Sequence, residues 1–185
     1  MAKKIGVIAE DISDVEVVKE ILAKYIDRRS FSVKHFVGQG CGKLRNKCGA
    51  WIDTLSKQGC THIFLFHDLD RSNEKALRKE IQEKIKSCLF QNSLIVIPTE
   101  ELEAWLLSDM DAIKQVFDIA APIKQISDVE AVKSPKEHLE KMVRRLSKKV
   151  YVNTIHNKKI AAQTTKANLM RCNSFQVLDK YLTAL

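Results

Sequence analysis

Acidic side chains follow three apolar runs of this sequence, each at the point where a strand is expected to end. They are Glu10 after the first run, Asp68 and Asp70 after the second, and Glu100, Glu101 and Glu103 after the third. Carboxylate oxygens are the ligands that hard cations such as Mg²⁺ take, and Mg²⁺ is usually held by one or two carboxylates together with substrate phosphate. The placement of these acids therefore predicts a metal site for Mg²⁺ or Mn²⁺ and chemistry on a phosphate group.

Strand and helix patterns alternate in the first half of the chain and would place these acids together. Apolar runs predict strands over 5–9, 31–37, 61–66 and 94–97, with helices from about 13 to 26, 43 to 55 and 73 to 88 between them. This alternation predicts an α/β fold with a mostly parallel four-stranded sheet flanked by helices. Because the carboxyl ends of parallel strands share one edge, where ligands bind, all six acids are expected on one rim.

Only helical periodicity is found after Glu100. Helices are expected over 100–107, 111–117, from Ser134, 158–170 and 174–185, whereas 118–133 has the composition of a connection. Ser13 with Glu16 and Ser134 with Glu137 match the capping-box pattern of a helix start. We predict an α/β domain over 1–118 and a helical C-terminal extension over 119–185 that packs on it as one compact unit.

The charge balance favours a polyanionic partner. Lys and Arg number 31 against 23 Asp and Glu, which gives a net charge of +8, and such an excess favours nucleic acid. The basic residues expected to contact a DNA or RNA backbone are Lys43, Arg71, Lys136 and Lys159.

Several patterns bear on the compartment. The sequence has no stretch of 18 apolar residues, which argues against a membrane span or membrane partner. The apolar run that ends at Ala9 is too short for a signal peptide. Five cysteines without a Cys-x-x-Cys pair indicate reduced thiols. Together these features predict a cytoplasmic protein.

Simpler interpretations stand beside the catalytic one. An Asp-x-Asp after a strand often caps a turn, and Asp11 and Asp14 are interpreted as charges that complement a helix dipole. The glycines around Gly40 form neither a P-loop nor a dinucleotide fingerprint and are interpreted as a flexible turn. Trp51 and Trp105 are both expected to be packing residues, and His67 is expected to lie on a buried strand.

Two segments carry a family resemblance. Ile5 to Asp14, with Glu10 at the strand end, and Phe64 to Asp70, with Asp68 and Asp70, resemble the two signature motifs of the Toprim superfamily. The resemblance implies that Glu10 acts as general acid/base and that the two aspartates hold Mg²⁺. It departs at Asp11, where many Toprim proteins have Gly.

A narrower resemblance covers most of the chain. The segment from Ile97 to Asp109, Ser134 to Glu137, Lys159 and its neighbours, and Cys172 to Phe175 are similar to small standalone Toprim proteins. These are related to the overcoming-lysogenization-defect nucleases and are often found near phage-defence genes. The resemblance implies that Glu103, and less directly Glu100 or Glu101, completes the metal site, and it adds an ATPase as a partner.

The hypothesis is therefore a metal-dependent nuclease that hydrolyses phosphodiester bonds of nucleic acid, with Glu10, Asp68 and Asp70 as catalytic residues. One alternative is a non-catalytic module that binds nucleic acid or a partner protein. Another is a receiver domain phosphorylated on aspartate, although Pro98 and Thr99 occupy the region where such a domain needs a strand-end Lys. The choice of DNA or RNA and the formation of a homodimer stay open.

Overall fold

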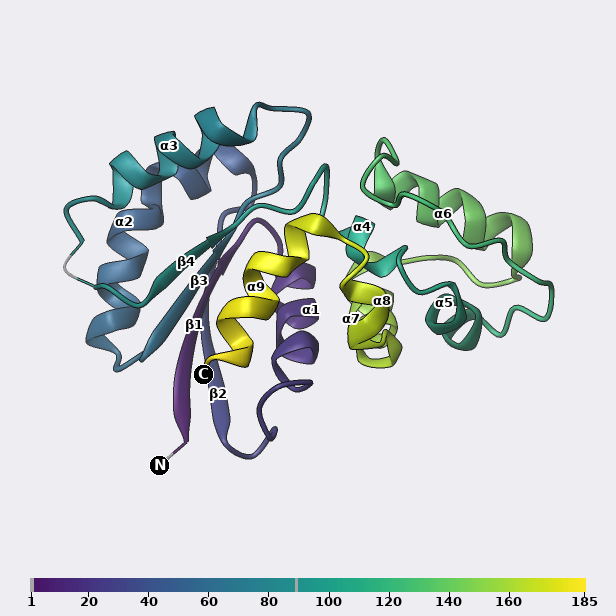
Figure 1. Ribbon diagram of the computed structural model, residues 1–185, viewed down its shortest axis with the longest axis horizontal. Helices are drawn as coiled ribbons and strands as arrows, with labels where there is room; N and C mark the ends of the chain where they lie inside the picture. The colour runs from purple at the N-terminus through teal and green to yellow at the C-terminus, as the bar shows by residue number, and fades with distance from the viewer. Residues whose placement is uncertain (1, 89) are drawn as a thin grey trace.

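The structure, a computed structural model, describes residues 2–88 and 90–185. Four parallel strands form its sheet in the spatial order β2-β1-β3-β4 (Figure 1). They are β1 (Lys3–Ala9), β2 (Phe31–Val37), β3 (His62–Phe66) and β4 (Ser93–Val96). The α/β fold with a parallel four-stranded sheet flanked by helices is thus confirmed, and each predicted strand lies within two residues of its expected bounds.

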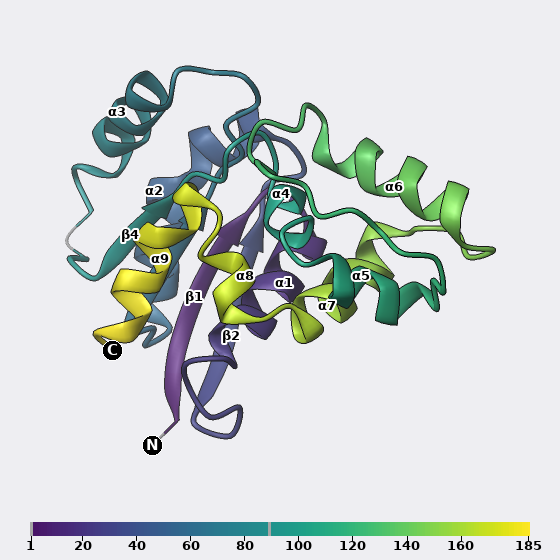
Figure 2. The ribbon, with the colours of Figure 1, turned by 45° about the vertical axis from the view of Figure 1, so that its right-hand side comes forward.

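Helices cover both faces of the sheet. One face carries α1 (Ile12–Leu22) and α9 (Asn173–Thr183), and the other carries α2 (Cys41–Lys57) and α3 (Glu74–Ile85) (Figures 1 and 2). Successive residues of a strand point to opposite faces. Accordingly Val7 packs in the core beside α1, while Ile8 packs in the core beneath α2. This burial on both faces is why the strands are continuous apolar runs.

The chain between β4 and α9 contains five helices joined by loops, the longest of which spans 118–134. The helices are α4 (Glu103–Leu106), α5 (Met110–Phe117), α6 (Pro135–Leu146), α7 (Asn153–Gln163) and α8 (Lys166–Leu169). Helix α7 packs along α1, and α9 then returns to the sheet (Figure 2). There the ring of Tyr181 meets the ring of Phe64 edge-on, with 5.4 Å between centroids. One core cluster therefore joins residues from before and after position 118.

Several predicted helix ends were wrong. The capping box of α1 is formed by Asp11 and Asp14, not by Ser13 and Glu16, because the helix begins earlier than expected. At α6, Pro135 occupies the first turn as predicted, but the Ser134 side chain caps nothing because its backbone is left-handed, with φ 49°.

Two other helices are shorter than expected. The predicted helix over 158–170 is interrupted, since Asp109 Oδ2 accepts the backbone N–H of Thr165 at 2.9 Å and the chain restarts as α8. The predicted helix over 100–107 starts only at Glu103, because Glu100 has φ 60°.

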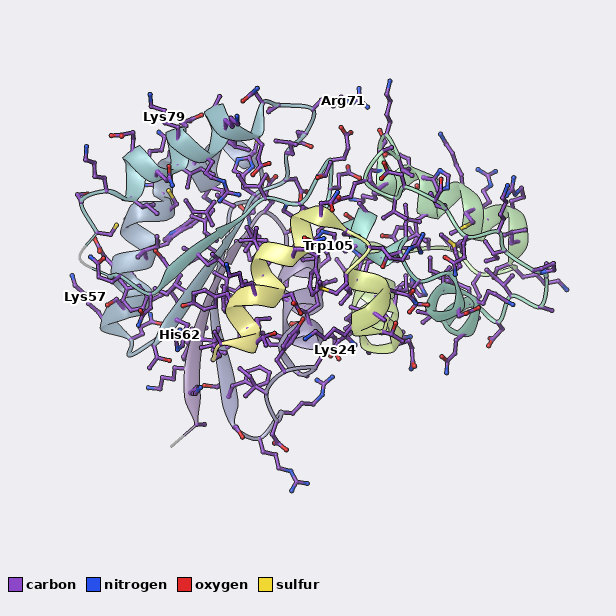
Figure 3. The ribbon with its side chains drawn as sticks, in the orientation of Figure 1. Lys24, Lys57, His62, Arg71, Lys79 and Trp105 are labelled. Carbon is purple, nitrogen blue, oxygen red and sulfur yellow. The ribbon has the colours of Figure 1, made fainter. Side chains whose placement is uncertain are left out.

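The two tryptophans have different environments. Trp105 is fully buried, as predicted (Figure 3), and its Nε1 donates to Ser174 Oγ at 2.8 Å. Trp51 is only half-buried and stacks on Phe36 with 5.3 Å between ring centroids. Over residues 2–88 and 90–185, none of the helices has the length and apolar character needed to cross a membrane.

Candidate functional site

A pocket of about 140 Å³ opens where β1 and β3 end. Residues from five segments line it: Glu10, Asp11, Ser13, Asp14, Asp68, Glu101, Glu103, Lys136 and Asn153. Six of these nine are acids, so the parallel sheet gathers carboxylates on one rim as the strand-end argument expected.

Glu10 lies at the end of β1 with 18% of its side chain exposed. Among the described residues its Oε1 is buried without a hydrogen-bond partner. Burial raises the pKa of Glu10 to about 7, and the negative charge of Asp70 contributes to the rise. A carboxyl group that titrates near neutral pH is suited to accept or donate a proton in catalysis.

His67 lies beside Glu10 without compensating its charge. Its Nδ1 is 3.5 Å from Glu10 Oε1 but only 2.7 Å from the Asp68 carbonyl oxygen. Burial lowers the pKa of His67 and so disfavours the charged ring. Its Nδ1 donates to the Asp68 carbonyl oxygen, because a carbonyl oxygen can only accept. His67, which was expected on a buried strand, lies one residue past the end of β3 and is 4% exposed.

Asp68 and Asp70 do not point the same way. Asp68 lines the pocket, and its Oδ1 accepts the backbone N–H of Leu102 at 3.1 Å. Asp70 is exposed, because the backbone turns left-handed there, with φ 46°, and extended geometry no longer applies. Burial raises the pKa of Asp68 well above its ordinary value, and the charges of Asp14 and Glu103 contribute next.

Glu103 and Asp14 complete the buried acidic group. Glu103, expected from the family resemblance, is 5% exposed, and its Oε1 accepts a hydrogen bond from Asn157 Nδ2 at 2.9 Å. Asp14 is 8% exposed, and its pKa is raised to about 7 by burial first and by Glu103 second.

Sequence reasoning missed Asp14 as a pocket residue. It was interpreted only as a helix-start charge, and it does accept the backbone N–H of Asp11 at 2.9 Å. That bond turns its side chain back toward the strand end and so into the pocket. The signal in the sequence was its position one helical turn after Glu10.

Glu100 and Glu101 have different surroundings, although they are neighbours in the sequence. Glu101 lines the pocket, and its Oε2 accepts the backbone N–H of Lys136 at 2.9 Å. Glu100 lies outside the lining and pairs with Arg71 at 3.5 Å. Of the five predicted metal ligands, Glu10, Asp68 and Glu103 are brought together in the pocket lining, while Asp70 and Glu100 are not.

The predicted basic contacts are spread around the pocket. Lys136 lines it, and Arg71, at the outer end of its loop (Figure 3), donates to Ser134 Oγ at 3.2 Å. Lys43 and Lys159 are exposed and outside the lining. Arg45, which the sequence did not single out, lies close enough to Glu10 to lower its pKa.

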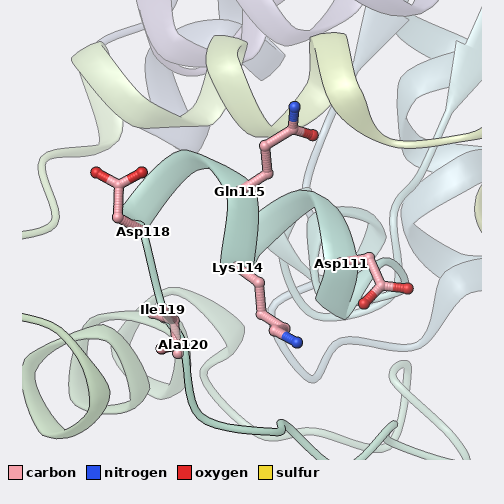
Figure 4. Close-up of a pocket in the computed structure, with 6 residues that line it drawn as sticks. All are labelled: Asp111, Lys114, Gln115, Asp118, Ile119 and Ala120. Atoms are coloured by element: carbon pink, nitrogen blue, oxygen red, sulfur yellow. The ribbon is translucent and has the colours of Figure 1, made fainter.

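The carboxylates are grouped but not arranged as a formed metal centre. Across residues 2–88 and 90–185, no three His, Cys, Asp or Glu side chains are placed to hold a metal ion as they stand. A larger cavity of about 430 Å³ lies along α5 and is lined by Asp111, Lys114, Gln115, Asp118, Ile119 and Ala120 (Figure 4). The two carboxylates of this larger cavity, Asp111 and Asp118, are exposed. The smaller pocket differs from it in being lined by buried acids.

Of the comparisons with known proteins, a family model gave a match, and it covers nearly the whole chain. No curated protein and no solved structure matches the sequence. The model of one family, described as "Domain of unknown function (DUF4276)", matches residues 9–183, a range that contains every residue of the acidic pocket. The chain therefore belongs to the DUF4276 family.

Proposed function

We propose that this protein is a Mg²⁺- or Mn²⁺-dependent nuclease that hydrolyses phosphodiester bonds of nucleic acid at the acidic pocket. One observation carries the proposal. Glu10, Asp14, Asp68 and Glu103 crowd together largely out of water, and within the described part of the chain none of them forms an ion pair with Lys or Arg.

Crowded buried carboxylates need a counter-charge. Desolvation and mutual repulsion both disfavour the ionised forms, so such groups either take up protons or bind a cation. The donors here are all carboxylate oxygens, which suits Mg²⁺ or Mn²⁺ and not a soft metal. The unpaired Oε1 of Glu10 supports the same assignment, because a buried acceptor without a partner is unfavourable.

The residues of the rim then take distinct roles. Asp14, Asp68 and Glu103 would hold the cation, with Glu10 at its edge and Asp70 facing solvent. A bound divalent cation supplies polarisation of the phosphate and compensation for the charge that develops in the transition state. Glu10 accepts the proton of the attacking water and returns one to the leaving oxygen as the P–O bond breaks. Lys136 and Arg71 bind neighbouring phosphates.

The resemblance to standalone Toprim proteins supports this assignment. It adds an ATPase partner and a role in phage defence to the proposal, and the cysteine pattern and short N-terminal apolar run add a cytoplasmic location. A net charge of +8 around an acidic pocket suits a polyanion whose scissile phosphate reaches the cation while its flanking phosphates contact Lys and Arg.

The test is cleavage of labelled single- and double-stranded DNA and RNA with Mg²⁺, Mn²⁺ or EDTA. The Asp68→Asn/Asp70→Asn variant removes two negative charges at the rim. The matched control is Asp53→Asn/Asp111→Asn, which removes two charges at exposed positions outside the pocket. We expect cleavage that needs the metal, that falls at least about 100-fold in the rim variant, and that is retained in the control.

Other outcomes would move the assignment. The non-catalytic module would be favoured if the protein binds nucleic acid without cleaving it and if neither the metal nor the rim variant changes this binding. Transfer of phosphate from a small phosphodonor to Asp68 would favour the receiver-type alternative. Cleavage that appears only with an added ATPase would keep the chemistry and establish the need for a partner.

A further inference from the structure

A buried amide holds one of the pocket carboxylates. Asn157 on α7 is fully buried, and its Nδ2 donates to Glu103 Oε1 at 2.9 Å. Its Oδ1 accepts the hydroxyl of Tyr151, which is 8% exposed, at 2.6 Å. A chain of two hydrogen bonds thus runs from the loop before α7 to the acidic pocket.

The two partners fix which way the amide faces. An ionised carboxylate, the form that binds a cation, can only accept, so in that form Glu103 requires the NH₂ end of Asn157. Burial and nearby carboxylates raise the pKa of Tyr151, so its hydroxyl keeps its proton and donates to the carbonyl end. Only one of the two amide orientations satisfies both neighbours, and Tyr151 therefore helps to hold the donor toward Glu103.

Asn157 differs from the other groups that anchor pocket carboxylates. One oxygen of each is held by an uncharged N–H: Asp14 by Asp11 N, Asp68 by Leu102 N, Glu101 by Lys136 N and Glu103 by Asn157 Nδ2. The first three donors are backbone amides. Among these four anchors Asn157 is therefore the one that a side-chain replacement removes.

This arrangement leaves the second oxygen available. Among the described residues, each of these four carboxylates accepts a hydrogen bond on one oxygen. A single fixed donor therefore orients the group, while the other oxygen can face a cation. Hydrogen-bond partners behind metal ligands fix ligand orientation, and losing one typically weakens metal affinity by about 10- to 100-fold.

We propose that Asn157, held by Tyr151, is a positioning residue that orients Glu103 for cation binding in the acidic pocket. The inference rests on the proposed function and deepens it. It assigns to α7 a role in building the site, alongside the strand-end residues that carry the acids.

The experiment measures Mn²⁺ affinity directly, from the electron paramagnetic resonance signal of free Mn²⁺ titrated with the full chain. Asn157→Leu removes the donor with little change of volume, and Tyr151→Phe removes only the hydroxyl. The matched control is Asn92→Leu, at an exposed asparagine directly before β4, at the amino ends of the strands and outside the acidic pocket. Circular dichroism at 25 °C establishes that each variant is folded.

We expect the Mn²⁺ dissociation constant to rise about 10- to 100-fold in Asn157→Leu and by a smaller factor in Tyr151→Phe, with no change in Asn92→Leu. Cleavage gives a second measurement: half-maximal activity should need more Mn²⁺ in the Asn157 variant, while the rate at saturating Mn²⁺ recovers. A residue that only supported the fold would not raise the Mn²⁺ concentration needed for half-maximal activity while leaving the rate at saturating Mn²⁺ unchanged. If Asn157→Leu does not fold, the Mn²⁺ affinity of Tyr151→Phe tests the proposal instead.

The two proposals fail in distinguishable ways. A wild-type protein that binds no Mn²⁺ would overturn the proposed function and this inference with it. A wild type that binds Mn²⁺, with unchanged affinity in the folded Asn157 and Tyr151 variants, would overturn the positioning role alone.

Discussion

Replacing Asp14 by Asn should stabilise the metal-free protein, and the gain should grow with pH. The pKa of Asp14 is raised from its ordinary value of 3.8 to about 7 by burial and by the charge of Glu103. Between about pH 4 and pH 7 the Asp14 carboxyl is ionised in the unfolded chain but still protonated in the folded protein. Rising pH therefore favours the unfolded chain and lowers the free energy of unfolding over this range. Asn keeps an oxygen that can accept the Asp11 N–H and removes only the charge.

The magnitude follows from the two pKa values. The folded and unfolded pKa values differ by about 3, and each pKa unit corresponds to about 1.4 kcal/mol. Asp14→Asn should therefore raise the free energy of unfolding by at most about 4 kcal/mol at pH 8. Below the unfolded pKa the carboxyl is protonated in both states, so the same calculation leaves less than about 1 kcal/mol at pH 4.

The assay is urea unfolding in EDTA at pH 4, 6 and 8, followed by circular dichroism. Asp53→Asn, at an exposed position of α2, is the control and should stay within about 0.5 kcal/mol of wild type at each pH. Equal stability of Asp14→Asn and wild type at pH 8, or a gain that does not depend on pH, would refute the conclusion that burial and the charge of Glu103 raise the pKa of Asp14.

Two further predictions concern the elements that position the site. Trp105→Ala should cost about 3–5 kcal/mol of the free energy of unfolding, because Trp105 is fully buried between Phe66 and Phe175; urea unfolding measures it, and a loss under about 1 kcal/mol would contradict this packing. Gly38→Ala should cost about 1–3 kcal/mol, because a Cβ there would lie 2.8 Å from Leu44 Cβ, whereas Gly42→Ala meets nothing within 4 Å and should be neutral or gain up to about 1 kcal/mol. The melting temperatures of Gly38→Ala and Gly42→Ala compare the two substitutions directly. Equal effects at the two glycines would count against the close approach of Gly38 to Leu44.

The strands were readable from local sequence. Phe31–Val37 has the predicted bounds, and the bounds of the other three strands differ from the predicted ones by one or two residues. Burial on both faces makes a strand continuously apolar, and this property depends on neighbours in sequence alone. The position of the acids at the strand ends followed from the same pattern.

Helix ends were less predictable. Asp11 and Ser13 both match cap residues, and which of them begins α1 depends on where the chain leaves β1. Similarly, the composition of 158–170 is helical throughout, but the hydrogen bond from Thr165 N to Asp109, a residue 56 positions earlier, separates α7 from α8. Local propensity cannot include a partner that distant.

By itself, then, the sequence determined the fold class, the four strands and the gathering of acids on one rim, because these follow from periodicity and from the shared direction of parallel strands. The tertiary structure decided which acids enter the pocket. It turned Asp70 outward through a left-handed backbone and brought Asn157 against Glu103 by packing α7 on α1. The physical reason is that such contacts depend on which apolar faces of distant helices meet, and periodicity within one helix reveals that it has an apolar face but not which partner covers it.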